Sequence, residues 1–174
     1  RPFTQVKLFV GVLSVEPRLS TALVGELERL FGIIEKTSDP IPFTYTHYYE
    51  EEMHAVPFRF FILFEDLIDP THLVQCKLNA IHLEDRHRSS TGGRTINLDP
   101  GILSSEKIIL ATTKHRSHRI ALGSGIYGEL TLMFQRGTFI TMPWTYADYA
   151  DPVYIEFFRN ARSNYRSQVK QINT

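Results

Sequence analysis

Phe58-Arg-Phe-Phe-Ile-Leu-Phe64 is an almost wholly apolar stretch in the first half of the chain. A short run of this kind, rich in aromatic residues, is typical of a strand in the centre of a sheet. A second apolar run, Val6-Lys-Leu-Phe-Val-Gly-Val-Leu-Ser-Val15, is rich in β-branched residues and ends at Glu16-Pro17. The two runs predict buried strands, around which the other elements can be placed.

Each of these strands is followed by a helical pattern. Apolar residues recur at helical spacing from Leu19 to Ile34, and Gly32 is a candidate C-cap. Asp69 and Pro70 are residue types that suit an N-cap and a first helical position. They predict a second helix, which carries apolar residues from Leu73 onwards.

The remaining elements are predicted from alternation, turn residues and capping residues. For the segment Leu103–Thr113 we favour a helix over a strand. The other expectations are a strand over Phe43–Tyr49, a short strand over Arg94–Leu98 closed by a turn at Asp99-Pro100-Gly101, a meander over 118–122, 126–134 and 138–142, and a helix from Asp151 to about Gln168.

The elements follow the order β-α-β-β-α-β and continue with a helix, a meander and a terminal helix. The first part of this order is that of a ferredoxin-like fold. The 174 residues fit a single domain, residues 1–174. We therefore predict an α+β sandwich with a ferredoxin-like N-terminal part, a C-terminal β-meander and a terminal helix.

The composition narrows the classes of protein. Lys plus Arg equals Asp plus Glu at 19 each, so no overall field attracts nucleic acid or an anionic membrane. No apolar run approaches about 18 residues, and we expect no membrane span. The single Cys76 excludes an internal disulfide and a multi-cysteine zinc site. We expect a cytoplasmic protein with no membrane partner.

Candidate catalytic residues gather in and beside the stretch Thr112–Leu132. His118 is a candidate general acid or base, and its alternative is a half-buried histidine bonded to a backbone carbonyl. Glu129 forms an acid–base pair with His118 if the strand register places both on one face. On an ideal strand, however, His118 and Arg119 point to opposite faces. Asp99 is a third candidate catalytic group, although Asp-Pro-Gly is also ordinary turn chemistry.

Candidate ligand-binding residues lie in the same region and in an aromatic cluster. Arg119 can hold a phosphate or carboxylate, or form a structural ion pair. Lys114 can contact phosphate, although the Gly-rich phosphate-loop pattern is absent. Tyr127 shares a predicted strand face with Glu129. The aromatic residues Tyr48 and Trp144 can stack on a base or sugar, or form a half-buried rim. No metal site is predicted, because no histidine and carboxylate set has recognised ligand spacing.

The chain also resembles a known family in several motifs. These are Val6-Lys-Leu-Phe-Val-Gly11, Asn97-Leu-Asp-Pro-Gly101, Ser117-His-Arg-Ile120 and Pro143-Trp-Thr-Tyr146, together with shorter matches in the same order along nearly the whole chain. The resemblance is to an uncharacterised prokaryotic family, domain-of-unknown-function family 4416, which implies no activity. The sequence departs from the family pattern at His54, where Gly is expected, at His115-Arg116 and at Gly128.

Two hypotheses on function remain open. The leading one is binding of a small anionic ligand such as a nucleotide or phosphorylated metabolite, with or without catalysis on it. The alternative is a non-catalytic module that contacts protein or RNA through an open patch, although the neutral charge does not favour nucleic acid. The sequence identifies no cofactor and no oligomeric state.

Overall fold

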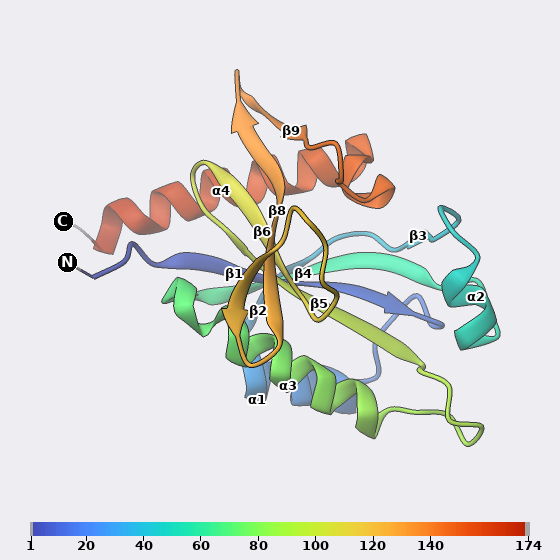
Figure 1. The fold of residues 1–174 in the computed structure, drawn as a ribbon. Helices are drawn as coiled ribbons and strands as arrows, with labels where there is room; N and C mark the ends of the chain where they lie inside the picture. The colour runs from blue at the N-terminus through green and yellow to red at the C-terminus, as the bar shows by residue number, and fades with distance from the viewer. Residues whose placement is uncertain (1, 173–174) are drawn as a thin grey trace.

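Strand β1 (Val6–Ser14) lies at the centre of the sheet, and all nine of its residues are buried. It pairs antiparallel with β4 (Phe58–Ile68) on one side and with β5 (Ile96–Leu103) on the other. The computed structural model describes residues 2–172 and is shown in Figure 1. The two apolar runs therefore form neighbouring strands in the middle of the sheet, as predicted.

In the described part of the chain the sheet has nine strands, and every pairing is antiparallel. The strand order is β2-β4-β1-β5-β6-β8-β7, while β3 pairs with β4 and β9 pairs with β8. The other strand bounds are β2 Ile34–Thr37, β3 Ile41–Pro42, β6 Lys107–Thr112, β7 Ile120–Gly123, β8 Ile126–Gln135 and β9 Thr138–Thr141. The predicted α+β class and the C-terminal meander are confirmed.

The ferredoxin-like part consists of β1, α1 (Thr21–Phe31), β2, β4, α3 (Leu73–Arg86) and β5. A short 3-10 helix, η1 (Pro70–His72), precedes α3, and Asp69 caps it by accepting a hydrogen bond from Thr71 N–H. The second strand of the motif is β2. The prediction of a strand over Phe43–Tyr49 is wrong.

Residues 43–47 form a loop that leads into α2 (Tyr48–Met53). Apolar side chains of this loop and of α2 cover the end of β1. Phe43 and Met53 are buried together with Leu13. At the end of α2, His54 has a φ of 55°. This left-handed conformation favours glycine, the residue that the family resemblance leads us to expect at this position.

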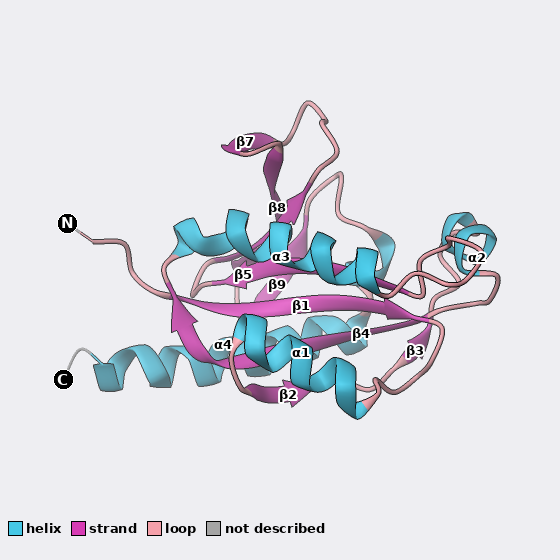
Figure 2. Ribbon diagram, turned by 90° about the horizontal axis from the view of Figure 1, so that it is seen from below, coloured by secondary structure: helices cyan, strands magenta, loops and turns pink. Residues whose placement is uncertain are grey.

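Helices cover both faces of the sheet. On one face, α1 and α3 pack on Leu8, Val10 and Val12 of β1. On the other face, α4 (Pro152–Ile172) packs on Phe9 and the neighbouring Phe61. Figure 2 shows α1 and α3 in front of the sheet and α4 behind it. The molecule is therefore a three-layer sandwich, and no helix of its described residues is long and apolar enough to cross a membrane.

Two further predictions of local structure are wrong, one for strand β5 and one for strand β6. Asp99-Pro100-Gly101 lies inside strand β5 and not in a turn. Leu103–Thr113 contains strand β6 and not a helix. In β6, Ile108 and Ile109 belong to hydrophobic clusters on opposite faces of the sheet. A strand buried on both faces is apolar throughout, and a short apolar run does not distinguish such a strand from a buried helix.

Gly101 is required by packing. A Cβ atom at this position would overlap the Phe9 ring and lie 2.9 Å from the Ile109 carbonyl oxygen. We expect Gly101→Ala to lower the free energy of unfolding by about 1–3 kcal/mol, because the core must shift to accept the methyl group. Urea unfolding of the purified variant measures the loss.

Gly25→Ala in α1 is the matched control. Its Cβ would meet only Arg29 Nη1, at 4.0 Å, and alanine favours a helix by about 1 kcal/mol over glycine. The control should therefore be stabilised. Equal stability of Gly101→Ala and the wild type would contradict the packing argument.

Candidate functional site

The sheet splits between β5 and β6. These strands pair only over Gly101–Leu103, whereas β6 continues to pair with β8 as far as Thr112. The first half of β5 therefore pairs with β1 alone. Figures 1 and 2 show β8 running steeply across the direction of β1. The divergence leaves an edge of β5 without a strand beside it.

Helix α3 takes the place of the absent strand at Leu98. The Leu98 N–H donates to Glu84 Oε1 at 2.6 Å, and the Leu98 carbonyl accepts from Lys77 Nζ at 2.8 Å. Both side chains are buried, on the face of α3 that packs against the sheet. Burial raises the pKa of Glu84, although the nearby Lys77 ammonium opposes the rise. The backbone of β5 is thus satisfied where β6 leaves it.

A cavity of about 300 Å³ lies beside this split. Its walls come from α3, from β4, β5, β6 and β8, from the segment around α2, and from the short helix η2 (Ala147–Ala150). Charged side chains of both signs line it. The basic ones are Arg59, Lys77, Arg94, Lys114 and Arg119, and the acidic ones are Glu84, Asp99, Glu129 and Asp148.

Arg59 is the buried cation of the β4 wall. Its Nε lies 2.8 Å from Asp148 Oδ2 and its Nη1 lies 3.5 Å from Asp99 Oδ2. Burial lowers the pKa of Arg59, but the two carboxylates outweigh burial and raise it, so the guanidinium stays charged. Gly11 makes room for the side chains of Arg59 and Tyr149, because a Cβ atom there would lie 3.2 Å from Arg59 Nη1 and 2.9 Å from the Tyr149 hydroxyl oxygen.

Asp99 is held by donors on three sides. Lys77 Nζ lies 3.4 Å from its Oδ1, Asn97 Nδ2 donates to its Oδ2 at 2.8 Å, and Arg59 lies beyond. Burial raises the pKa of Asp99, but Lys77 and Arg59 together bring it below its ordinary value. A carboxylate with a lowered pKa is a weak base near neutral pH. Asp99 therefore acts as a fixed counter-ion between two cations.

Glu129 is buried in β8 and receives two neighbours from one turn. Its Oε2 accepts from Arg119 Nε at 2.6 Å and lies 2.9 Å from His118 Nε2. The sequence-based expectation that His118 and Arg119 point apart is wrong, because β7 begins at Ile120 and both residues lie in the preceding turn. His118 stacks on Trp144 with ring centroids 4.7 Å apart.

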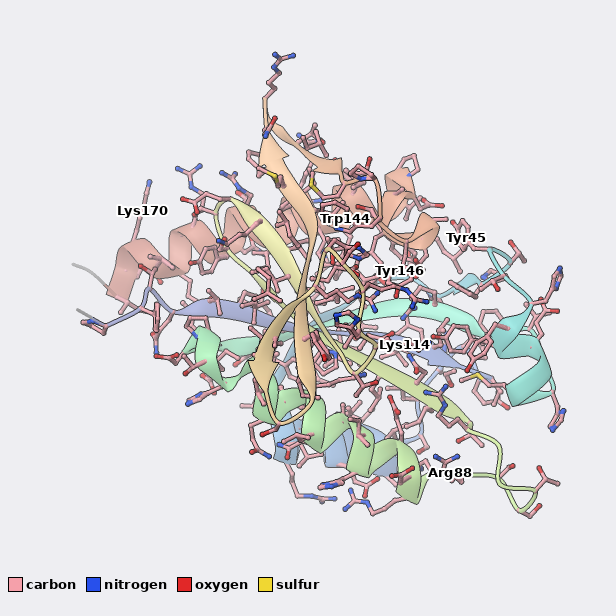
Figure 3. All side chains as sticks on the ribbon, viewed as in Figure 1. Tyr45, Arg88, Lys114, Trp144, Tyr146 and Lys170 are labelled. Atoms are coloured by element: carbon pink, nitrogen blue, oxygen red, sulfur yellow. The ribbon has the colours of Figure 1, made fainter. Side chains whose placement is uncertain are left out.

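Arg119 connects this part of the site to η2. Its Nη2 donates to the Tyr146 hydroxyl at 2.8 Å, and its Nη1 donates to the Lys114 carbonyl, also at 2.8 Å. Lys114 and Tyr146 lie near each other at the centre of Figure 3, whereas Arg88 and Lys170 lie at the periphery. The contacts therefore run from Glu129 through Arg119 and Tyr146 to the helix that carries Asp148.

Several buried polar atoms in the cavity wall have no hydrogen-bond partner. Among the described residues these include Glu129 Oε1, the Tyr149 hydroxyl and Arg59 Nη1. Arg59 Nε and Asp148 Oδ2 also make no aligned hydrogen bond, although they face each other as an ion pair. An unsatisfied buried polar group costs about 1–3 kcal/mol, and such groups are rare in folded proteins. Because these atoms have almost no accessible surface, a group in the cavity does not reach them in this arrangement of the side chains.

The structure brings some of the sequence-predicted residues together and leaves others apart. Asp99, Glu129, Arg119, Lys114 and Tyr48 line the cavity. The other three are not in its wall: His118 and Trp144 stack on each other beside Glu129, and Tyr127 contacts the His115 ring at a centroid distance of 5.5 Å.

Sequence reasoning missed Arg59, Lys77 and Asp148, whereas Tyr149 was part of the aromatic cluster predicted to stack on a base or sugar or to form a half-buried rim. Arg59 is the one charged residue in the apolar run 58–64, and Lys77 lies on an apolar face of its helix. A charged residue predicted to be buried is unusual, so both positions could have been recognised from the sequence. Asp148 and Tyr149 enter the site through the 3-10 helix η2, which no local pattern indicates. The described residues contain no cluster of His, Cys, Asp and Glu that could hold a metal ion.

Comparison with known proteins gives a family without an activity. Residues 4–165 match the family described as Domain of unknown function (DUF4416), and the chain belongs to this family. No curated protein and no solved structure matches the chain. Any function must therefore be argued from the site itself.

The charge network makes a prediction about acid stability. The folded-state pKa of Asp99 lies below its ordinary value of 3.8, so its ionised form stabilises the fold above that pH. This contribution is lost as the pH falls from 3.8 through the folded-state pKa. Asp99→Asn should lower the free energy of unfolding by about 1–3 kcal/mol at pH 7, since it removes the partner of two cations. The deficit should shrink below pH 3.8.

Urea unfolding of wild type and variant between pH 7 and pH 3 measures this difference. Asp85→Asn is the control, because Asp85 is exposed near the end of α3 and pairs with the exposed Arg88 just beyond the helix. Exposed pairs of this kind contribute little, so the control should follow the wild type throughout. A deficit that stays constant with pH would contradict the assigned role of Asp99.

Proposed function

We propose that the protein binds a small anionic ligand, of the nucleotide or phosphorylated-metabolite class, in the cavity at the β5–β6 split. The observation that carries the proposal is the gathering of charged side chains around this one cavity, among which the Lys114 ammonium has no carboxylate within ion-pair distance in the described part of the chain. Such a site is preorganised, because the charges are already held in place before the ligand arrives.

The charge balance supports an anion as the ligand. Five basic and four acidic side chains line the cavity. Among the described residues, Lys114 has no carboxylate within ion-pair distance, and its ammonium faces the Tyr48 ring at 5.3 Å from the centroid. Arg59 adds a second positive charge to the wall, although it is paired with Asp148 and Asp99. A phosphate or carboxylate is the group that these donors suit.

The size of the cavity supports a small ligand. A volume of about 300 Å³ is at the lower end of the range for ligand sites. The alternative hypothesis, a module that contacts protein or RNA, calls for an open patch, whereas the charged side chains here line a cavity. The lowered pKa of Asp99 and its fixed contacts favour binding over acid–base catalysis by that residue.

Lys114→Met tests the proposal. The purified protein is screened by thermal shift against inorganic phosphate, nucleoside monophosphates and sugar phosphates. We expect at least one of these anions to raise the Tm, and Lys114→Met to weaken its Kd about tenfold, which corresponds to about 1.4 kcal/mol. The loss should shrink as salt rises, because the contact is ionic.

Arg116→Met provides the matched control. Arg116 is exposed two residues after Lys114 in the same loop and does not line the cavity. The substitution therefore removes the same positive charge outside the proposed site. It should bind the anion like the wild type. If no anion stabilises the wild type, or if the two variants lose affinity equally, the cavity is not the anion site.

A further inference from the structure

We propose that the ligand is a nucleoside monophosphate, which places its base on the Tyr48 ring and its phosphate at Lys114. This inference rests on the proposed function, because it names the class of anion that the same cavity binds. It starts from the accessible side chains of the wall. Tyr48 and Lys114 are both exposed and both line the cavity, so a ligand can reach them directly.

Tyr48 presents an accessible ring that is anchored from behind. The residue is 55% exposed. Its ring meets the ring of Tyr49 edge to face, with centroids 5.2 Å apart, and Tyr49 meets Phe43 in the same way at 5.8 Å. Phe43 is buried beside Leu13, so these contacts connect Tyr48 to the core. An aromatic ring that is held in place and open to solvent is a platform on which a base can stack.

A second exposed ring lines the same cavity. Tyr146 is 47% exposed, and its hydroxyl accepts a hydrogen bond from Arg119 Nη2 at 2.8 Å. Single exposed aromatic residues are ordinary on a protein surface. Tyr45 is of this kind, because it lies outside the cavity wall and donates its hydroxyl hydrogen to Asp151. Two exposed rings around one charged cavity form instead the aromatic wall of a ligand site.

The charges of the wall indicate a single phosphate group. The four basic side chains other than Lys114 pair with carboxylates of the wall: Arg59 with Asp148 and Asp99, Lys77 with Asp99, Arg94 with Glu84, and Arg119 with Glu129. In the described part of the chain, the Lys114 ammonium has no such partner. A diphosphate or triphosphate would bring further charges into the cavity without a cation to pair with them, which is costly.

The ring and the cation lie side by side, as a nucleotide requires. The Lys114 ammonium lies 5.3 Å from the centroid of the Tyr48 ring. A cation–π contact at an exposed site is weak, so a phosphate competes successfully for the ammonium. The ring that the ammonium leaves is then free to stack on the base. A sugar phosphate has no planar group to use this ring, whereas a nucleotide uses both groups.

Two matched pairs of probes test the base site. AMP is compared with ribose 5-phosphate, which has the same sugar and phosphate but no base. Phenyl phosphate is compared with cyclohexyl phosphate, whose ring is of similar size but is neither flat nor aromatic. Isothermal titration calorimetry of the wild type should give a Kd at least about tenfold lower for the aromatic member of each pair.

Substitutions of Tyr48 locate the selection. Tyr48→Leu should raise the Kd of AMP about tenfold and leave that of ribose 5-phosphate within about twofold of the wild type, because only the base loses its partner. Tyr48→Phe keeps the ring and should bind both probes like the wild type. Tyr45→Leu is the matched control, since Tyr45 is exposed in the same loop and does not line the cavity.

The outcomes separate the two levels of the argument. If no phosphate probe binds the wild type, the proposed function fails. If the two members of each pair bind equally well, or if Tyr48→Leu and Tyr45→Leu lose the same affinity for AMP, anion binding stands and the base site is overturned. Should Tyr48→Leu fail to fold, the wild-type comparison of the paired probes decides the class of ligand.

Discussion

The side chains of α3 that bond to the backbone of Leu98 are the constraint on which the site depends. A strand that loses its neighbour exposes a backbone N–H and a carbonyl, and burying them without partners is costly. Glu84 and Lys77 supply those partners. Because of these two bonds, β6 can turn away from β5 while the edge of β5 remains in the protein interior. The cavity is the space that this divergence leaves open.

Charges of alternating sign contact one another along the wall of the cavity. Lys77 contacts Asp99, Asp99 contacts Arg59, and Arg59 contacts Asp148. The series then continues through η2 and Tyr146 to Arg119 and Glu129. Buried charges are tolerated when each has a partner of opposite sign, and removing one member leaves another uncompensated. The arrangement therefore fixes side-chain positions more than it adds net stability.

The sequence predicted the fold wherever local patterns and tertiary packing agreed. The apolar runs of β1 and β4 and the capped starts of the helices are of this kind. The turn predicted at Asp99-Pro100-Gly101 is wrong, because these three residue types favour a turn when only local sequence is considered. In the fold, Gly101 is needed for close packing on Phe9, and Pro100 lies where the ladder to β6 has not yet begun, so its missing N–H costs no strand bond.

The site could be predicted in part, for a related reason. Glu129, Arg119 and Lys114 lie close together in sequence, and the short β7–β8 hairpin returns them to one place. Arg59 and Lys77 were detectable only as charges on apolar elements, since their partners come from distant segments. The position of His118 depends on one boundary. Because β7 begins two residues later than the alternation indicated, His118 contacts Glu129 from the turn and stacks on Trp144.

Glu129 links the cavity to the rest of this region. One carboxylate oxygen orients Arg119 and His118, and through Arg119 it is connected to Tyr146 and η2. The other oxygen is the one without a partner. One buried carboxylate therefore holds together the turn before β7 and, through Arg119 and Tyr146, the start of η2.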